Sequence, residues 1–92
     1  MIVSIRHKGL KRLYEDGDVR GIGANMRQRV QEILSVLDAA ENIEEADLPG
    51  YRLHPLTGDR LGFWSIRVNG NWRVTFRFED GRVKDVDLED YH

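Results

Sequence analysis

Apolar residues in the first half of the chain recur at helical spacing. After an alternating, strand-like segment at residues 2–6, three large residues lie three and four positions apart and predict a short helix over residues 8–16: Leu10, Leu13 and Tyr14. Gly17 is expected to end this helix, and the glycine-rich residues 17–23 are expected to form a loop.

A longer helix is predicted over residues 25–41. Its apolar face consists of residues at intervals of three and four, namely Met26, Val30, Ile33, Leu34, Leu37 and Ala40. Asn25 with Gln28 three positions later is typical of a capping box, so we expect the helix to begin at Asn25. Its apolar face is expected to pack in the core and not to bind a partner.

Beyond Tyr51 the period shortens to two, which is typical of β-strands. Alternating runs flank Asn69-Gly70-Asn71 and predict a hairpin. Pairing Val68 with Trp72 across a three-residue loop keeps the apolar residues on one face, with Asn71 in the left-handed conformation. We expect this loop or an equivalent bulge.

A second hairpin turn is predicted at Asp80-Gly81, and alternation beyond it places Asp85 beside Arg77 and Asp87 beside Thr75. The expected fold is therefore α+β, with two helices packed on one face of a small, mainly antiparallel sheet of four to five strands. The other face, which contains the arginines, is expected to be open. At 92 residues the chain is expected to form one domain over residues 1–92.

The composition excludes several classes of protein. Cysteine is absent, which rules out disulfides and thiolate chemistry. Residues 1–6 lack the long apolar stretch of a signal peptide, and no apolar run approaches the roughly 20 residues of a membrane helix. We therefore expect a cytoplasmic protein without contact to a membrane.

Charged residues are segregated along the chain, although the net charge is only −2. Residues 51–84 contain seven basic and three acidic side chains, and six of the seven are arginines. Residues 21–50 and 85–92 are acidic. The basic block favours either a site for a polyanion or a solvated sheet face with lateral salt bridges, and charge alone leaves both interpretations open.

Few residues are suited to proton transfer at neutral pH. The chain has three histidines, the residue type best suited to this role. His54 precedes Pro55, which predicts the end or the edge of a strand. His92 is the last residue, and His7 is expected to be a surface or capping residue. Arg73 lies in the middle of the most regular predicted strand. Taken singly, each of these residues is more often an ordinary surface residue than part of a site.

A series of short motifs makes the chain resemble a known family. They are Leu53-His54-Pro55-Leu56-x-Gly58-Asp59-Arg60-x-Gly62, Trp64-Ser65-Ile66, Asn71-Trp72-Arg73-Val74-x-Phe76 and Asp90-Tyr91-His92. In this order and spacing they resemble the HigB toxins of the RelE superfamily, which belong to bacterial toxin–antitoxin systems. The resemblance covers essentially the whole chain.

This resemblance implies a metal-independent endoribonuclease without a cofactor, which cleaves messenger RNA in the A site of the 70S ribosome. It also implies a HigA-type helix-turn-helix antitoxin. The toxin would contact operator DNA only indirectly, through this antitoxin. The implied catalytic residues are His54, Arg73, Asp90, Tyr91 and His92, and the expected RNA contacts are Arg60, Arg67 and Arg77. Thr57 stands where several relatives have lysine, so that a phosphate contact is absent here or is supplied by Arg60.

The implied chemistry suits these residue types. Attack by the 2′-hydroxyl of RNA requires a base, an acid and a cation for the phosphorane, and histidine can serve in either proton transfer. Two other functions remain open: a toxin of the same fold that binds a protein target such as gyrase, and a non-catalytic RNA- or ribosome-binding module. Neither alternative needs the histidines.

Overall fold

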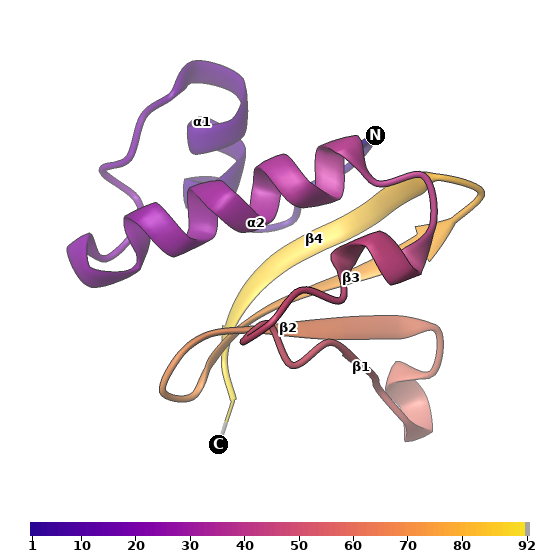
Figure 1. Ribbon diagram of the computed structural model, residues 1–92. Coiled ribbons are helices and arrows are strands. Elements are labelled where there is room, and N and C mark those ends of the chain that lie inside the picture. Colours follow the sequence, from indigo (N-terminus) through magenta and orange to yellow (C-terminus); the bar gives the residue numbers. More distant parts are fainter. Residues whose placement is uncertain (92) are drawn as a thin grey trace.

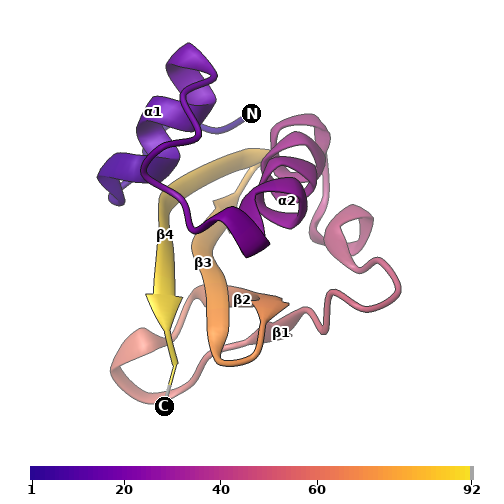
Figure 2. The ribbon, with the colours of Figure 1, turned by 90° about the vertical axis from the view of Figure 1, so that its left-hand side faces the viewer.

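The computed structural model describes residues 1–91 and contains two α-helices beside an antiparallel sheet (Figure 1). The helices are α1 (Lys8–Asp16) and α2 (Arg27–Ala39), with 3-10 turns at Ala24–Met26 (η1), Ile43–Ala46 (η2) and Gly58–Arg60 (η3). The strands are β1 (His54–Pro55), β2 (Phe63–Asn69), β3 (Trp72–Glu79) and β4 (Arg82–Asp90), hydrogen-bonded in that order. Both helices lie on the same face of the sheet (Figure 2), and the expected α+β class is confirmed.

The N-terminal segment and α1 agree with the sequence pattern except in one respect. His7 caps α1, because its Nδ1 accepts a hydrogen bond of 3.1 Å from the Leu10 N–H, and left-handed Gly17 (φ 70°) ends the helix. The segment before α1 runs parallel to β4, and its bridge pairing with that strand is limited to two isolated bridges, Ile2 with Val83 and Ile5 with Val86. The expected first strand is therefore reduced to these two bridges.

The start of α2 differs from the expected capping box. Residues 24–26 form the η1 turn, in which the Met26 N–H donates to the Gly23 carbonyl at 2.9 Å, and α2 begins only at Arg27. No side chain caps the helix, so the predicted role of Asn25 is wrong. The turn places the Met26 side chain in the core.

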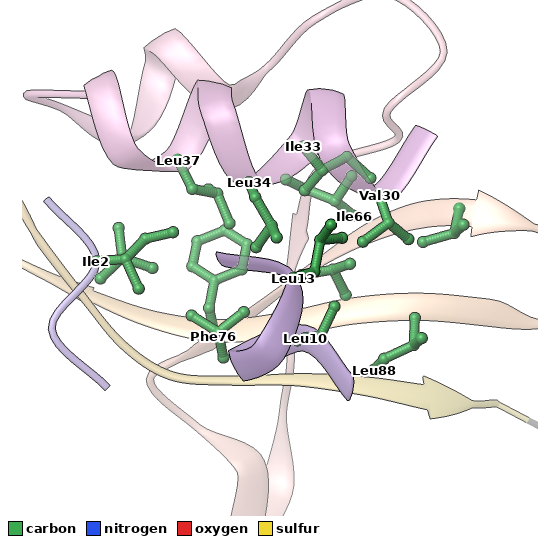
Figure 3. Packing of buried hydrophobic residues seen from close by; sticks show 14 of the residues in the cluster. Ile2, Leu10, Leu13, Val30, Ile33, Leu34, Leu37, Ile66, Phe76 and Leu88 are labelled. Atoms are coloured by element: carbon green, nitrogen blue, oxygen red, sulfur yellow. The ribbon is translucent and has the colours of Figure 1, made fainter. Parts of the chain in front are cut away.

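The core fills the space between the helices and the sheet (Figure 3). Phe76 of β3 is fully buried and points toward Leu34 and Leu37 of α2. Burial of one such side chain contributes about 1.5–3 kcal/mol. The apolar faces predicted for α2 and for the hairpin both line this core, whereas Trp64 and Trp72 are only partly buried at its margin.

The β2–β3 hairpin contains the expected bulge. Ile66 pairs with Val74, but Asn69, and not Val68, pairs with Trp72, so Val68 is the extra residue of β2. The turn has two residues, and Gly70 (φ 54°) adopts the left-handed conformation expected for Asn71. The bulge keeps the apolar residues of both strands on the helix side.

A second bulge in β4 changes the order of charges on the other face. Thr75 pairs with Asp87 as expected, but Arg77 pairs with Lys84. Asp85 is the extra residue: it has a left-handed backbone (φ 54°), its N–H donates to Ser4 Oγ, and its carboxylate lies 3.6 Å from Arg6. The expected pairing of Asp85 with Arg77 is therefore wrong.

Candidate active site

The sheet register places several of the predicted site residues on the face turned away from the helices. One row across the strands contains Arg67, Arg73 and Glu89, and a neighbouring row contains His54, Ser65, Thr75 and Asp87. Directly opposed residues share a face, so His54 and Arg73 lie on the same face. Ideal strand spacings put their Cα atoms about 12 Å apart.

The centre of this face is covered, contrary to the expectation of an open surface. Ser65 and Thr75 are almost completely buried, with exposed fractions of 1% and 0%. Residues 57–62, which include η3, lie on the side of the sheet away from the helices (Figure 1), and Arg60 extends from there to β4. The segment 57–62 is called the β1–β2 loop below.

Arg60 forms a two-point ion pair with Glu89 beneath the β1–β2 loop. Its Nη1 and Nη2 donate to Oε1 and Oε2 at 3.1 and 2.7 Å, and its guanidinium lies 5.1 Å from the centroid of the Phe63 ring. The Thr75 hydroxyl donates to the same carboxylate. The hydrogen bond to Arg60 lowers the pKa of Glu89, and the same bond raises the pKa of Arg60, with a further contribution from the nearby Tyr91.

The arginines of this face are not equivalent. Arg77 donates to Glu79 at 3.0 Å, and Arg60 is paired with Glu89. In contrast, no carboxylate within residues 1–91 forms an ion pair with Arg67 or Arg73. The arginines of this face that form no ion pair within residues 1–91 are therefore Arg67 and Arg73, near the β2–β3 turn.

Arg73 is held in place by backbone carbonyls. Its Nη1 donates to the Gly70 carbonyl at 2.8 Å and to the Trp72 carbonyl at 3.0 Å. Both acceptors are uncharged carbonyls, so these bonds restrict the orientation of the guanidinium without forming an ion pair. A restricted cation of this kind can donate to the oxygens of a phosphate.

His54 lies on the edge strand β1, as its position before Pro55 indicated, and is exposed. Its Nδ1 is 2.9 Å from the Arg52 carbonyl, at a residue with left-handed backbone (φ 51°). A carbonyl oxygen can only accept, so Nδ1 carries the proton and Nε2 of the neutral ring is free to accept one. This is the tautomer that a general base on Nε2 requires.

The last two described residues, Asp90 and Tyr91, lie at the end of the sheet where Arg73 lies. Asp90 pairs with Trp72, and the Tyr91 N–H donates to the Asn71 carbonyl at 2.7 Å. The Tyr91 side chain is 47% exposed and is not part of the core. His92, a predicted catalytic residue, lies outside the described residues.

Glu89 and Thr75 are central to this face but were not among the predicted site residues. Simple alternation from Leu88 would have placed Glu89 on the same face as Arg73. Its pairing with Arg60 joins residues far apart in sequence and could not be read from local spacing. Within residues 1–91, no cluster of three or more histidines and carboxylates is arranged to hold a metal ion, and no helix is long and apolar enough to span a membrane.

Comparison with known proteins identifies the family. Residues 3–92 match the family described as RelE-like toxin of type II toxin-antitoxin system HigB. The chain belongs to this family. It is 47% identical over 92 residues to Endoribonuclease HigB of Proteus vulgaris, covering 100% of both chains. It is 36% identical over 85 residues to Toxin HigB-1 of Vibrio cholerae serotype O1, covering 88% of this chain and 87% of that one.

Solved structures of related toxins share the fold of this HigB-family chain. The YoeB-YefM complex from Staphylococcus aureus has a TM-score of 0.64 at 18% identity, covering 100% of this chain and 95% of that chain. The YoeB/ParE toxin from Agrobacterium tumefaciens has a TM-score of 0.62 at 18% identity, covering 99% and 96%. The RelE-like fold implied by the sequence motifs is thus confirmed.

Proposed function

We propose that this chain, an endoribonuclease toxin of the HigB family, cleaves messenger RNA in the A site of the ribosome by attack of the 2′-hydroxyl on the neighbouring phosphate. One observation carries the proposal. Arg73, which has no ion pair within residues 1–91, is fixed on the sheet face that also presents His54, at the end where the last two described residues lie.

Each proposed catalytic residue has a role that fits its environment. Arg73 stabilises the charge on the phosphorane, as a preorganised cation can. His54 exchanges a proton through Nε2, and His92 performs the second proton transfer. Tyr91 stacks on an unpaired base, which contributes about 1–3 kcal/mol. Asp90 orients the C-terminal segment.

The proposed RNA contacts fall into two groups. Arg67 is available to a phosphate, because it has no carboxylate partner within residues 1–91. Arg60 and Arg77 each pair with a glutamate, which offsets their charge, so each attracts a phosphate less strongly than Arg67 and contacts one through its remaining N–H groups. Thr57 precedes η3, so a phosphate contact made by lysine in relatives is absent here or is supplied by Arg60 of that turn.

The partners follow from the family. As a toxin of a type II toxin–antitoxin system, the chain has an antitoxin. We infer that this antitoxin is a HigA-type helix-turn-helix protein, that operator DNA is reached only through it, and that the toxin acts in the cytoplasm on 70S ribosomes. A small protein with this DNA-binding pattern encoded beside the toxin would support the pairing.

The activity is tested with purified toxin, programmed ribosomes and a defined message. Arg73→Met should reduce the cleavage rate by about 10²–10³-fold, the usual cost of removing a donor to a developing oxyanion. Arg82→Met is the matched control, since it removes the same charge from an exposed position at the other end of the sheet. Equal rates for both variants, or intact messages with the unmodified toxin, would contradict the proposal. Growth arrest that persists with intact messages would instead favour a protein-binding or RNA-binding toxin.

A further inference from the structure

The Arg60–Glu89 ion pair joins two distant parts of the sheet. Arg60 belongs to the β1–β2 loop, which follows the edge strand β1, whereas Glu89 belongs to β4, at the opposite edge. Thr75 of β3 donates to the same carboxylate from the strand between them. A single carboxylate therefore connects the loop with the two strands that carry Arg73 and the C-terminal residues.

Little else holds the β1–β2 loop against the sheet. Within the described residues, its side-chain hydrogen bonds are those from Arg60 to Glu89, and the remaining bonds are the turns from the Arg60 N–H to Thr57 and from the Leu61 N–H to Gly58. Leu61 is 78% exposed and adds no burial. The loop is closed at its base by the hydrogen bond from the Leu56 N–H to the Phe63 carbonyl at 2.9 Å, and beyond this base its place over the face depends on the ion pair and on the contact of Arg60 with the Phe63 ring.

The sign of the charge on Glu89 is unfavourable for RNA binding. Glu89 is the strand partner of Arg73, the residue proposed to meet the phosphate. A carboxylate in this position repels an RNA backbone and weakens binding of the message. An uncharged residue at position 89 would give a higher affinity for RNA than glutamate does. Any contribution of Glu89 to activity must therefore come from the groups that it holds in place, Arg60 and Thr75.

We propose that Glu89 is a positioning residue of the active site, which holds the β1–β2 loop and Arg60 over the sheet beside Arg73. This inference rests on the proposed function. Glu89 acts through Arg60 and Thr75 and does not itself touch the scissile phosphate. The loop directly follows the strand that carries His54, so its anchoring also fixes the proposed acid–base residue relative to Arg73.

The test is Glu89→Gln, which keeps the size of the side chain and removes its charge. Cleavage of a message on programmed ribosomes should slow by about 10–100-fold, because small displacements of catalytic groups are costly. Binding to ribosomes that carry a message with a 2′-deoxy nucleotide at the cleavage site should instead become about threefold tighter, because a repulsive charge is lost. A purely structural role for Glu89 would not produce these opposite changes.

Two further variants separate the anchoring of the β1–β2 loop from the effect of the negative charge of Glu89. Arg60→Gln also frees the loop but removes a cation, so cleavage should slow as in Glu89→Gln while binding becomes weaker. Asp18→Asn is the matched control. Asp18 forms a comparable two-point pair with Arg20, at 2.9 Å for both contacts, in the loop between the helices, and this variant should leave cleavage and binding unchanged.

Amide hydrogen exchange of residues 57–62 provides a readout that does not require activity. Faster exchange in Glu89→Gln, with slower cleavage and tighter binding, supports the proposal. Unchanged exchange, or a cleavage rate equal to that of the unmodified toxin, overturns it. If the unmodified toxin leaves messages intact, the proposed function fails, and the exchange of residues 57–62 alone decides whether Glu89 anchors the loop.

Discussion

The coupling between Arg60 and Glu89 can be measured as a free energy. Two unit charges about 4 Å apart attract by about 4 kcal/mol at an effective dielectric constant of 20. The two side chains are 37% and 26% exposed, so solvent removes a large part of this attraction. Fully exposed pairs retain about 0.2–1 kcal/mol. Since this pair is partly buried and two-point, we expect a coupling of about 1–2 kcal/mol.

The assay is a double-mutant cycle of urea unfolding with Arg60→Gln, Glu89→Gln and the double variant. The double variant should be less destabilised than the sum of the single variants by the coupling energy. The same cycle on the Arg20–Asp18 pair should give a smaller value, because the Arg20 side chain is 88% exposed. A coupling for Arg60–Glu89 no larger than that of the control pair would refute the anchoring of the β1–β2 loop by this ion pair.

Two further predictions concern stability. Gly9→Ala should lower the free energy of unfolding by about 1–3 kcal/mol, because a Cβ at this position would lie 2.5 Å from the Gly21 carbonyl oxygen. The control is Lys11→Ala on the exposed side of α1, which should change the free energy of unfolding in urea little. The lowered pKa of Glu89 means that its ionised form stabilises the fold above about pH 4.3, the ordinary value for glutamate, and that this contribution is lost as the pH falls further. The free energy of unfolding should therefore fall less between pH 5 and pH 3 in Glu89→Gln than in the unmodified protein, and equal pH dependence would contradict this.

Local patterns were sufficient to predict both helices and the β2–β3 hairpin, but not that the expected first strand is reduced to two bridges. The apolar spacing around Leu10 and in α2 indicated both helices, and alternation indicated β2 and β3, because each signal depends on neighbours within a few residues. The capping box at Asn25 failed, because residues 24–26 form a 3-10 turn and α2 begins only at Arg27. The hairpin bulge was predicted because a one-residue slip would have moved charged residues into the core.

The arrangement of charges could not be predicted in the same way. The β4 bulge at Asp85 shifts the register of half a strand, and at this bulge the Asp85 N–H donates to Ser4, 81 residues away in the sequence. Over the sheet, Arg60 of the β1–β2 loop meets Glu89, which is a further long-range contact. Composition indicated a basic face, but only tertiary structure separates Arg73, without a carboxylate partner in residues 1–91, from Arg60, which has one.

The ends of the cleaved message test the central claim most directly. Toxin and programmed ribosomes are incubated with a message that carries either ribose or 2′-deoxyribose at the A-site position, and the products are mapped and their termini determined. Attack by the 2′-hydroxyl should give a cut within the A-site codon, with a 2′,3′-cyclic phosphate and a 5′-hydroxyl, and the deoxy message should stay intact. Cleavage of the deoxy message, or products with a 5′-phosphate, would contradict the mechanism.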